Sequence, residues 1–288
     1  MAIGNFTPEI WSAKILSDYD KQFVFGNVVN RDYEGDIRAY GDTVRINSLG
    51  PVSVGTWTKD STTMTVQPLI GLDQTLVIDK ADYFSFWVDD IDKAQNNPKV
   101  MGEAMRKAAV ALAETADARI GGMYVDAGIT MTTAACGPTA IIEQLAFIHR
   151  ELDENNVPFP GRWAVIPPWL YSNMILAELG FQPSTNAGIS NVDGTATFEA
   201  GRVGRVMGLD IYMSNNLTEH ASHTAAVPYH YVMAGTREAI TFADQIASVE
   251  AYRPEQQFAD AVKGLHVYGM KVCQPKALVA LPAQYSTV

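Results

Sequence analysis

The stretch NPKVMGEAMRKAAVALAETADARIGGMYVD occupies residues 97–126 and predicts one long helix. Asn97 can cap a helix through its side-chain oxygen, and Pro98 suits the first helical position, where no N–H is needed. We expect the charged Glu114 and Asp117 to stay in water. At 1.5 Å per residue the helix would be roughly 35–40 Å long. Apolar residues recur in steps of three or four and predict one buried stripe: Met101, Met105, Ala108, Leu112, Ala116, Ile120 and Met123.

The N-terminal residues form a small arm with large aromatic side chains. Trp11, Tyr19 and Phe23, together with Ile15, line one face of a short helical pattern that Gly26 ends. So little chain surrounds this face that it could fold back on its own core. It could equally pack on a neighbouring subunit, and the residues leave both readings open.

Residues 36–88 have the composition that is typical of β-strands. We expect strands at 43–47, 52–58, 63–66, 76–78 and 83–88, where β-branched and aromatic residues gather. The part between Gly50 and Gly71 has many threonines and few large aliphatic residues. Such a hairpin has too little apolar material to bury itself, and an isolated two-stranded hairpin is marginal in water. Either it lies on its own domain or it is an extended arm that needs a partner.

The chain after the long helix alternates helices and strands. We expect helices at 138–155 and 169–179, strands at 163–166, 204–214 and 231–234, and a small α/β layer that 239–249 completes. Short strands follow at 248–253, 265–272 and 277–281. The fold class is therefore α+β.

Composition narrows the function classes. Hydrophobic residues make up 47% and charged residues 18%, which is enough for a substantial core. The net charge of −11 argues against a protein that grips phosphates through a basic stripe. No apolar run approaches the ~18–20 residues that span a membrane, and no secretory signal is visible. Cys136 and Cys273 lack metal-like spacing, so buried free thiols are favoured, with a bridge left open.

Catalytic and ligand-binding motifs are absent from the pattern. The glycines of GRVGRVMG at 201–208 precede a strand instead of following one, so a turn is favoured over a phosphate loop. His220 and His223 lie in a polar loop without converging ligands. Asp89, Asp90 and Asp92 precede the long helix, where negative charge suits its dipole better than it suits a metal. We predict no catalytic, cofactor-binding or metal-binding residues, and hence a structural role.

Five stretches together resemble the major capsid (coat) protein of a tailed bacteriophage with the Hong Kong 97-type fold, which is also seen in encapsulins. They are NRDYEGDIRAYGDTVRINSLGPV (30–52), FSFWVDDIDKAQ (84–95), the long helix, VPFPGRWAVIPPWLY (157–171) and FADAVKGLHVYGMKVCQPKALVAL (258–281). The resemblance rests on the order of the elements and on their residue composition, since none of the five stretches is a catalytic signature.

The resemblance implies a division of labour along the chain. Residues 1–35 would be the N-terminal arm and 36–82 the extended loop. Residues 83–129 and 248–288 would form a peripheral domain, in which the long helix is the spine beside a β-sheet. Residues 130–247 would be an axial α/β domain that meets its copies at the centres of hexamers and pentamers.

The resemblance also implies the partners. The protein would be made in the host bacterial cytoplasm and reside in the capsid of the virion. It would assemble with itself, with the help of a separate scaffolding protein and a portal, around packaged double-stranded DNA without sequence-specific contacts or a membrane. Lys59 lies near the loop tip, where some family members cross-link, but a solvated turn lysine is favoured. The candidate inter-subunit contacts are Trp11, Tyr19, Phe23, Trp57, Lys59, Asp60 and Thr62.

Two alternatives remain open from the sequence. The first is an encapsulin-type nanocompartment, which would assemble alone and hold a cargo enzyme. The second belongs to another class: an α/β enzyme with its site in 130–247, because active sites can be assembled from scattered residues. Large closed assemblies would count against the enzyme.

Overall fold

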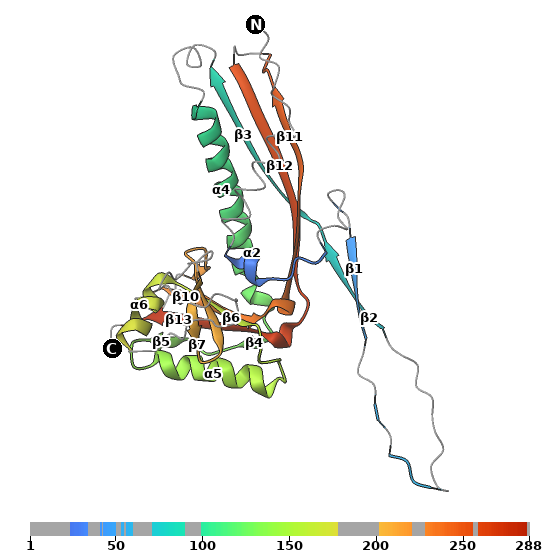
Figure 1. The fold of residues 1–288 in the computed structure, drawn as a ribbon, viewed down its shortest axis with the longest axis vertical. Coiled ribbons are helices and arrows are strands. Elements are labelled where there is room, and N and C mark those ends of the chain that lie inside the picture. The colour runs from blue at the N-terminus through green and yellow to red at the C-terminus, as the bar shows by residue number, and fades with distance from the viewer. Residues whose placement is uncertain are drawn as a thin grey trace, which may run out of the picture.

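The computed structural model describes residues 24–33, 41, 43–49, 53–54, 56–59, 71–89, 99–177, 202–220, 228–255 and 259–286. Two sheets and a long helix dominate this part of the chain (Figure 1). None of the helices within these ranges is both long enough and apolar enough to cross a membrane.

Helix α4 is the predicted long helix. It runs from Lys99 to Gly121 and continues as the 3-10 helix η2, Gly122–Asp126. The predicted stripe is confirmed at Met105, Leu112, Ala116 and Ile120, while Ala109 and Ala113 lie deeper than Ala108. Small alanine side chains let the helix approach its neighbours closely. The prediction for Asp117 was wrong: its side chain is fully buried.

A three-stranded antiparallel sheet lies along α4. Its order is β11 (Ile240–Tyr252), β12 (Ala259–Val272) and β3 (Lys80–Asp89). Exposure alternates along β3, as expected for a strand with one face on a helix and one in water. Met105 and Ala109 of the helix pack against Val249 and Val262 of the sheet. The predicted boundary at 247/248 falls inside β11, so 240–247 lies in this sheet.

The second sheet has eight strands and follows the order β4-β13-β10-β6-β8-β7, with β5 beside β13 and β9 beside β10. Its strands are β4 (Ile129–Thr130), β5 (Ala134–Cys136), β6 (Arg162–Ile166), β7 (Arg202–Val206), β8 (Leu209–Met213), β9 (Glu219–His220), β10 (Tyr229–Thr236) and β13 (Leu278–Tyr285). Helices α5 (Ile141–Glu154) and α6 (Pro168–Leu176) pack on it around one apolar core.

Strand β13 departs from the position expected for the C-terminal strands. The predicted division groups residues 248–288 with the spine helix, and β12 does lie beside β3. β13 instead pairs with β10, from Tyr229 opposite Gln284 to Gly235 opposite Leu278. The division of the chain into domains stays a prediction, but any such division must allow the C-terminal region to enter both sheets.

The two sheets meet at a joint made of short elements. Helix α2 (Phe25–Val28) and the 3-10 helices η4 (Arg237–Ala239) and η5 (Pro275–Ala277) lie there. The backbone N–H groups of Cys273 and Gln274 both donate to the carbonyl of Ala239, and that of Gly128 donates to Pro275. One apolar core fills the joint and includes Phe25, Ile120 and Trp163.

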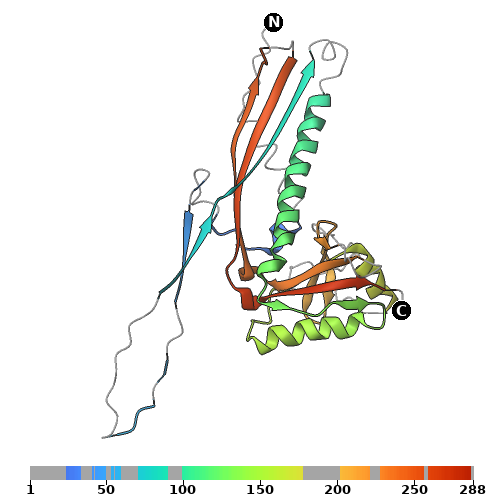
Figure 2. The ribbon, with the colours of Figure 1, turned by 180° about the vertical axis from the view of Figure 1, so that it is seen from behind.

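The β1–β2 hairpin points away from both sheets, as the two opposite views show (Figures 1 and 2). Strand β1 (Thr43–Leu49) pairs antiparallel with β2 (Gly71–Val77). The strand expected at 52–58 is not formed at the described residues 53–54 and 56–58.

Candidate interaction surface and the contacts that position it

The base of the β1–β2 hairpin is fixed to strand β12 by polar contacts. The side-chain amide of Gln74 donates to the carbonyl of Cys273 at 3.0 Å, and the Lys271 ammonium donates to the carbonyl of Thr75 at 2.8 Å. Val44, Leu76 and Ile78 bury a small apolar core with Ala243 and Val267. The hairpin therefore leaves the body in a set direction.

Gly269 of β12 permits this close approach. A Cβ at this position would lie 2.4 Å from the carbonyl oxygen of Val77 and 2.8 Å from Cδ1 of Ile78. Real side chains do not tolerate a contact that short with backbone, so β2 could not run where it does beside any larger residue.

The described residues that follow β1 expose apolar side chains. Val54 is 96% exposed and Trp57 is 63% exposed, and Lys59 is also exposed. Trp57 and Lys59, two of the candidate contacts, are therefore both exposed in the segment that follows β1. The other candidate contacts, Trp11, Tyr19, Phe23, Asp60 and Thr62, lie outside the described residues.

Asp117 ties three parts of the chain together at the joint. One carboxylate oxygen accepts the backbone N–H of Phe25 at 2.8 Å, and the other accepts the side-chain amide of Asn216 at 3.2 Å. The helix α4, the start of α2 and the segment after β8 therefore meet on one carboxylate. Burial raises the pKa of Asp117 above its ordinary value, and the hydrogen bonds from Asn216 and Phe25 act against this rise.

A second polar contact links α4 to the three-stranded sheet. Arg119 pairs with Asp82 of β3 at 2.8 Å, and the hydroxyl of Tyr268 on β12 donates to the same carboxylate. Burial is the main cause that raises the pKa of Tyr268, so its hydroxyl stays protonated. Helix, edge strand and central strand are held in one register by this carboxylate.

A third contact ties the chain leading out of α2 to the same sheet. Arg31 pairs with Asp244 of β11 at 3.1 Å, and His266 of β12 lies 3.1 Å from the other oxygen of that carboxylate. His266 and Asp244 are both buried. The segment from Val24 to Arg31 is therefore fastened at each end, by Asp117 and by Asp244.

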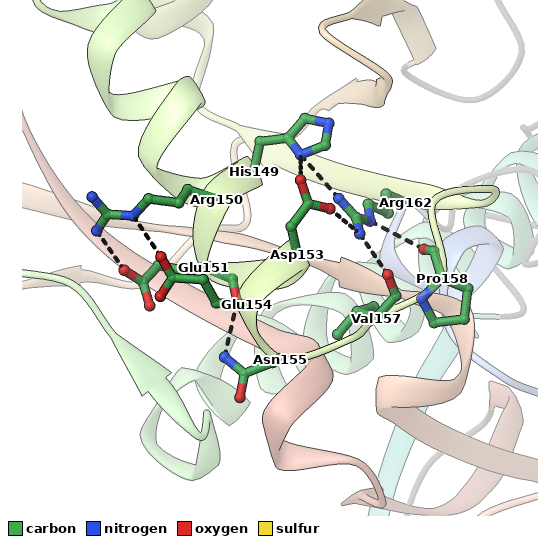
Figure 3. Close-up of polar contacts among 9 residues, drawn as sticks. All are labelled: His149, Arg150, Glu151, Asp153, Glu154, Asn155, Val157, Pro158 and Arg162. Carbon is green, nitrogen blue, oxygen red and sulfur yellow. Dashed lines mark hydrogen bonds and ion pairs between the residues drawn. The ribbon is translucent and has the colours of Figure 1, made fainter.

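Arg162 organises the loop between α5 and β6 (Figure 3). Its guanidinium is only 1% exposed, and it donates to the carbonyls of Pro158 and Val157 and to Asp153 at 2.7 Å. It also lies over the ring of Phe159. Four partners from one short segment satisfy the buried charge, so the loop is held closed on α5.

The comparisons with known proteins decide the family. The family described as phage capsid protein matches residues 73–281, which include α4 and both sheets. The chain belongs to the phage capsid protein family. None of the curated proteins compared with this capsid protein matches it.

Solved capsids share the fold of this capsid protein. A structure titled Mycobacterium phage Che8 is 29% identical, with a TM-score of 0.69 and coverage of 97% of this chain and 98% of that chain. The capsid of cyanophage P-SCSP1u is 17% identical, with a TM-score of 0.67 and coverage of 92% and 89%. A virus-like particle from Pyrococcus furiosus is 13% identical, with a TM-score of 0.57 and coverage of 95% and 98%.

Family membership confirms the resemblance and the α+β capsid fold. The capsid protein is a structural component of the virion that assembles with itself into an icosahedral phage shell, and it is not an enzyme. Within the described ranges, no three or more His, Cys, Asp or Glu side chains are grouped to hold a metal ion.

The structure also tests two smaller predictions, the turn at the glycines of 201–208 and the free thiols of the two cysteines. Met207 and Gly208 form the tight turn of the β7–β8 hairpin, with φ of 49° and 84°, so the predicted turn is confirmed there. Gly201 and His223 lie outside the described residues, and His220 lies in β9. Cys136 and Cys273 are buried free thiols, and burial raises the pKa of Cys136 to about 11.

Sequence reasoning missed the residues that position the surface. Asp117 continues the spacing of Ala109 and Ala113 in steps of four, so the buried side of α4 could have been seen to include it. Gln74 and Lys271 carry no comparable signal, because their partners are backbone carbonyls that any sequence supplies. Arg162 also bonds to backbone carbonyls, and nothing in the sequence indicates that it is buried beside Asp153.

Proposed function

We propose that the chain forms the hexamers and pentamers of an icosahedral shell that encloses packaged double-stranded DNA. The observation that carries the proposal is the β1–β2 hairpin, which projects from the body with Val54 and Trp57 in water. Its apolar tip gains free energy only when another surface covers it. A neighbouring copy in a closed ring would supply that surface. Because the same contact recurs between all neighbouring subunits, many modest contacts together would stabilise the shell.

The described fold supports a division into parts with different tasks. The eight-stranded sheet with α5 and α6 would be the axial domain, and α4 with β3, β11 and β12 the peripheral domain. The fixed base of the hairpin would set where its tip, residues 53–59, meets a neighbour. The N-terminal arm with Trp11, Tyr19 and Phe23 would make further contacts between subunits.

The acidic net charge of the chain supports a shell that encloses DNA without binding its phosphates tightly. With a net charge of −11, the protein repels phosphates on balance, so packaged DNA would slide past it without sequence-specific binding. A separate scaffolding protein and a portal would complete the assembly. The match to the phage capsid protein family favours this role over an encapsulin-type compartment.

The test is the size of the purified protein, measured by sedimentation with electron microscopy of the heaviest fraction. Closed shells, or rings of five and six, support the proposal. A stable monomer or dimer, even with scaffolding protein or crowding agents added, contradicts it. Shells that fill with double-stranded DNA in infected cells support the phage role, and shells that carry an enzyme support the encapsulin role.

Substitutions at the hairpin tip test its part in assembly. Val54→Ser and Trp57→Ser should lower the yield of closed shells and leave the fold of the subunit unchanged. Val125→Ser is the matched control, because Val125 in η2 is also exposed but lies far along the chain from the hairpin. Equal shell yields for Val54→Ser and Val125→Ser would remove the hairpin tip from the proposed interface.

A further inference from the structure

The ring of His149 on α5 faces two groups that make opposite demands on it (Figure 3). Its Nδ1 atom lies 3.0 Å from Nη1 of Arg162 and 3.1 Å from an oxygen of Asp153. A ring nitrogen without a proton accepts the Arg162 N–H, and a protonated one donates to Asp153. It cannot do both, so a proton on Nδ1 selects Asp153 and its absence selects Arg162; a neutral ring can be either tautomer, whereas a protonated ring always carries this proton.

The choice matters because Arg162 is buried. Its Nε and Nη2 groups are occupied by Pro158, Val157 and Asp153, while Nη1 points at His149. When His149 is neutral with its proton on Nε2, its Nδ1 accepts from Nη1 of Arg162. When His149 is protonated, two cationic groups face each other and a buried N–H loses its acceptor, which is unfavourable at low exposure.

The imidazole has room to leave. Its side chain is 18% exposed, and it borders a shallow hollow of about 420 Å³. Asp153 and Glu154 of α5 bring negative charge to this hollow, and Arg150 is paired with Glu151 and Glu154. Met207 of the β7–β8 turn also borders the hollow and carries no charge. Outside the hollow, the uncharged Phe159 of the loop and the charged Arg162 of β6 contact the His149 ring. A protonated ring would therefore turn toward the carboxylates.

The loop that Arg162 holds also supports the β7–β8 turn. The ring of Phe159 packs against His149 at 5.4 Å between centroids. It also fills the space left by Gly208, where a Cβ would lie 2.6 Å from it. Movement of His149 and Arg162 would therefore reach the turn at Met207 through Phe159.

We propose that His149 is a proton-operated catch, meaning a side chain whose protonation opens the loop 157–161. When neutral, His149 accepts from Arg162 and the loop stays closed on α5 and on the β7–β8 turn. When protonated, His149 releases Arg162 and the loop opens. Histidine is the side chain whose charge changes between about pH 5 and pH 8, so mild acid is the signal. The inference concerns the single chain and holds whatever shell the chain builds.

Hydrogen exchange of the full-length chain tests the catch. Peptides that span 153–163 report on the amides of Asn155, Asn156 and Val157, which bond back to α5. Protection, corrected for the intrinsic effect of pH on exchange, should fall about two- to tenfold between about pH 7.5 and pH 5.5, as loss of one net hydrogen bond implies. Peptides at 203–209 should follow, while those of α4 and β10 stay unchanged.

Two variants separate the catch from general acid sensitivity. His149→Asn places a side-chain amide at about the position of the Nδ1 atom. This amide can accept from Arg162 and donate to Asp153 at every pH, so the fall in protection should disappear. His230→Asn is the matched control, because His230 also uses Nδ1, as acceptor for Trp169, and the fall should remain.

The outcomes that overturn the proposal are distinct. Wild-type protection at 153–163 that does not change with pH would overturn it, as would an equal fall in His149→Asn. An acid-induced loss of protection that extends equally over α4 and β10 would show general loosening instead, and this result comes from the wild-type chain even where the variant fails to fold.

Discussion

Replacing Asp117 by alanine should loosen the start of helix α2 without unfolding the rest of the chain. The carboxylate accepts the backbone N–H of Phe25 and the side-chain amide of Asn216. Alanine removes both acceptors. Phe25 is fully buried, so its N–H would find no water in exchange.

The magnitude follows from these two donors. A buried donor left without a partner costs about 1–3 kcal/mol. Asn216 is half-buried and can turn toward water, so it adds at most about 1 kcal/mol. Removal of a carboxylate that is costly to bury offsets part of the loss. We expect a net cost of about 2 kcal/mol, which corresponds to local exchange faster by about 30-fold.

The assay is hydrogen exchange of peptides spanning 24–32. The amides of Val29 and Asn30 bond to Phe25 and Ile240, so they report whether α2 stays on the joint. Glu114→Ala is the control, because Glu114 lies on the same helix in water and its loss should change stability by less than about 0.5 kcal/mol. If Asp117→Ala exchanged at 24–32 as slowly as Glu114→Ala, Asp117 would not be what holds the arm.

The same residue predicts a dependence on pH with a definite sign. Burial raises the pKa of Asp117 in the folded chain above its unfolded value. The favourable contribution is therefore complete below the unfolded pKa and is lost as pH rises through the folded pKa. The free energy of unfolding of the wild type, relative to Asp117→Asn, should fall as pH is raised from about 4 and then level off. A relative stability that rises over this range would refute the argument.

Three further perturbations have clear expectations. Gly269→Ala should reduce shell yield in sedimentation with unchanged circular dichroism, because its Cβ displaces β2, whereas Gly122→Ala, with open space at its Cβ, should not; equal yields would contradict the account of the hairpin base. Neither Cys136 nor Cys273 should react with a thiol reagent near pH 8 until denaturant is added, since both are buried; rapid labelling of the native chain would contradict this. Tyr268→Phe should lower the free energy of unfolding in urea by about 1–2 kcal/mol by removing a donor to Asp82, while Tyr83→Phe, at an exposed site, should have no effect; similar midpoints would count against the Asp82 contact.

Periodicity was enough to locate α4, because buried residues recur every three or four positions from Met105 to Ile120. It failed at Asp117, since a carboxylate reads as a solvent residue until its partners are known. Those partners, Phe25 and Asn216, are distant in sequence, and nothing local indicates that they converge.

The strands also show that local sequence does not reveal which distant segments pair. Residues 278–285 have the composition of a buried strand, yet composition does not say which sheet they enter, and β13 crosses from the neighbourhood of β12 to pair with β10. Around the hairpin, the scarcity of apolar residues predicts that the segment cannot bury itself, and Val54 and Trp57, which lie in its described part, are exposed. The direction in which it projects depends on Gln74, Lys271 and Gly269, whose contacts exist only in three dimensions.

The order in which the strands are synthesised has a consequence for quality control. Strand β12 lies between β11 and β3, and β13 lies between β10 and β4 with β5, so each is translated after every strand that it pairs with. A chain interrupted before residue 259 lacks an interior strand of both sheets. We expect the ribosome to release such fragments as unfolded polypeptides for proteolysis, so that incomplete copies never compete for places in the shell.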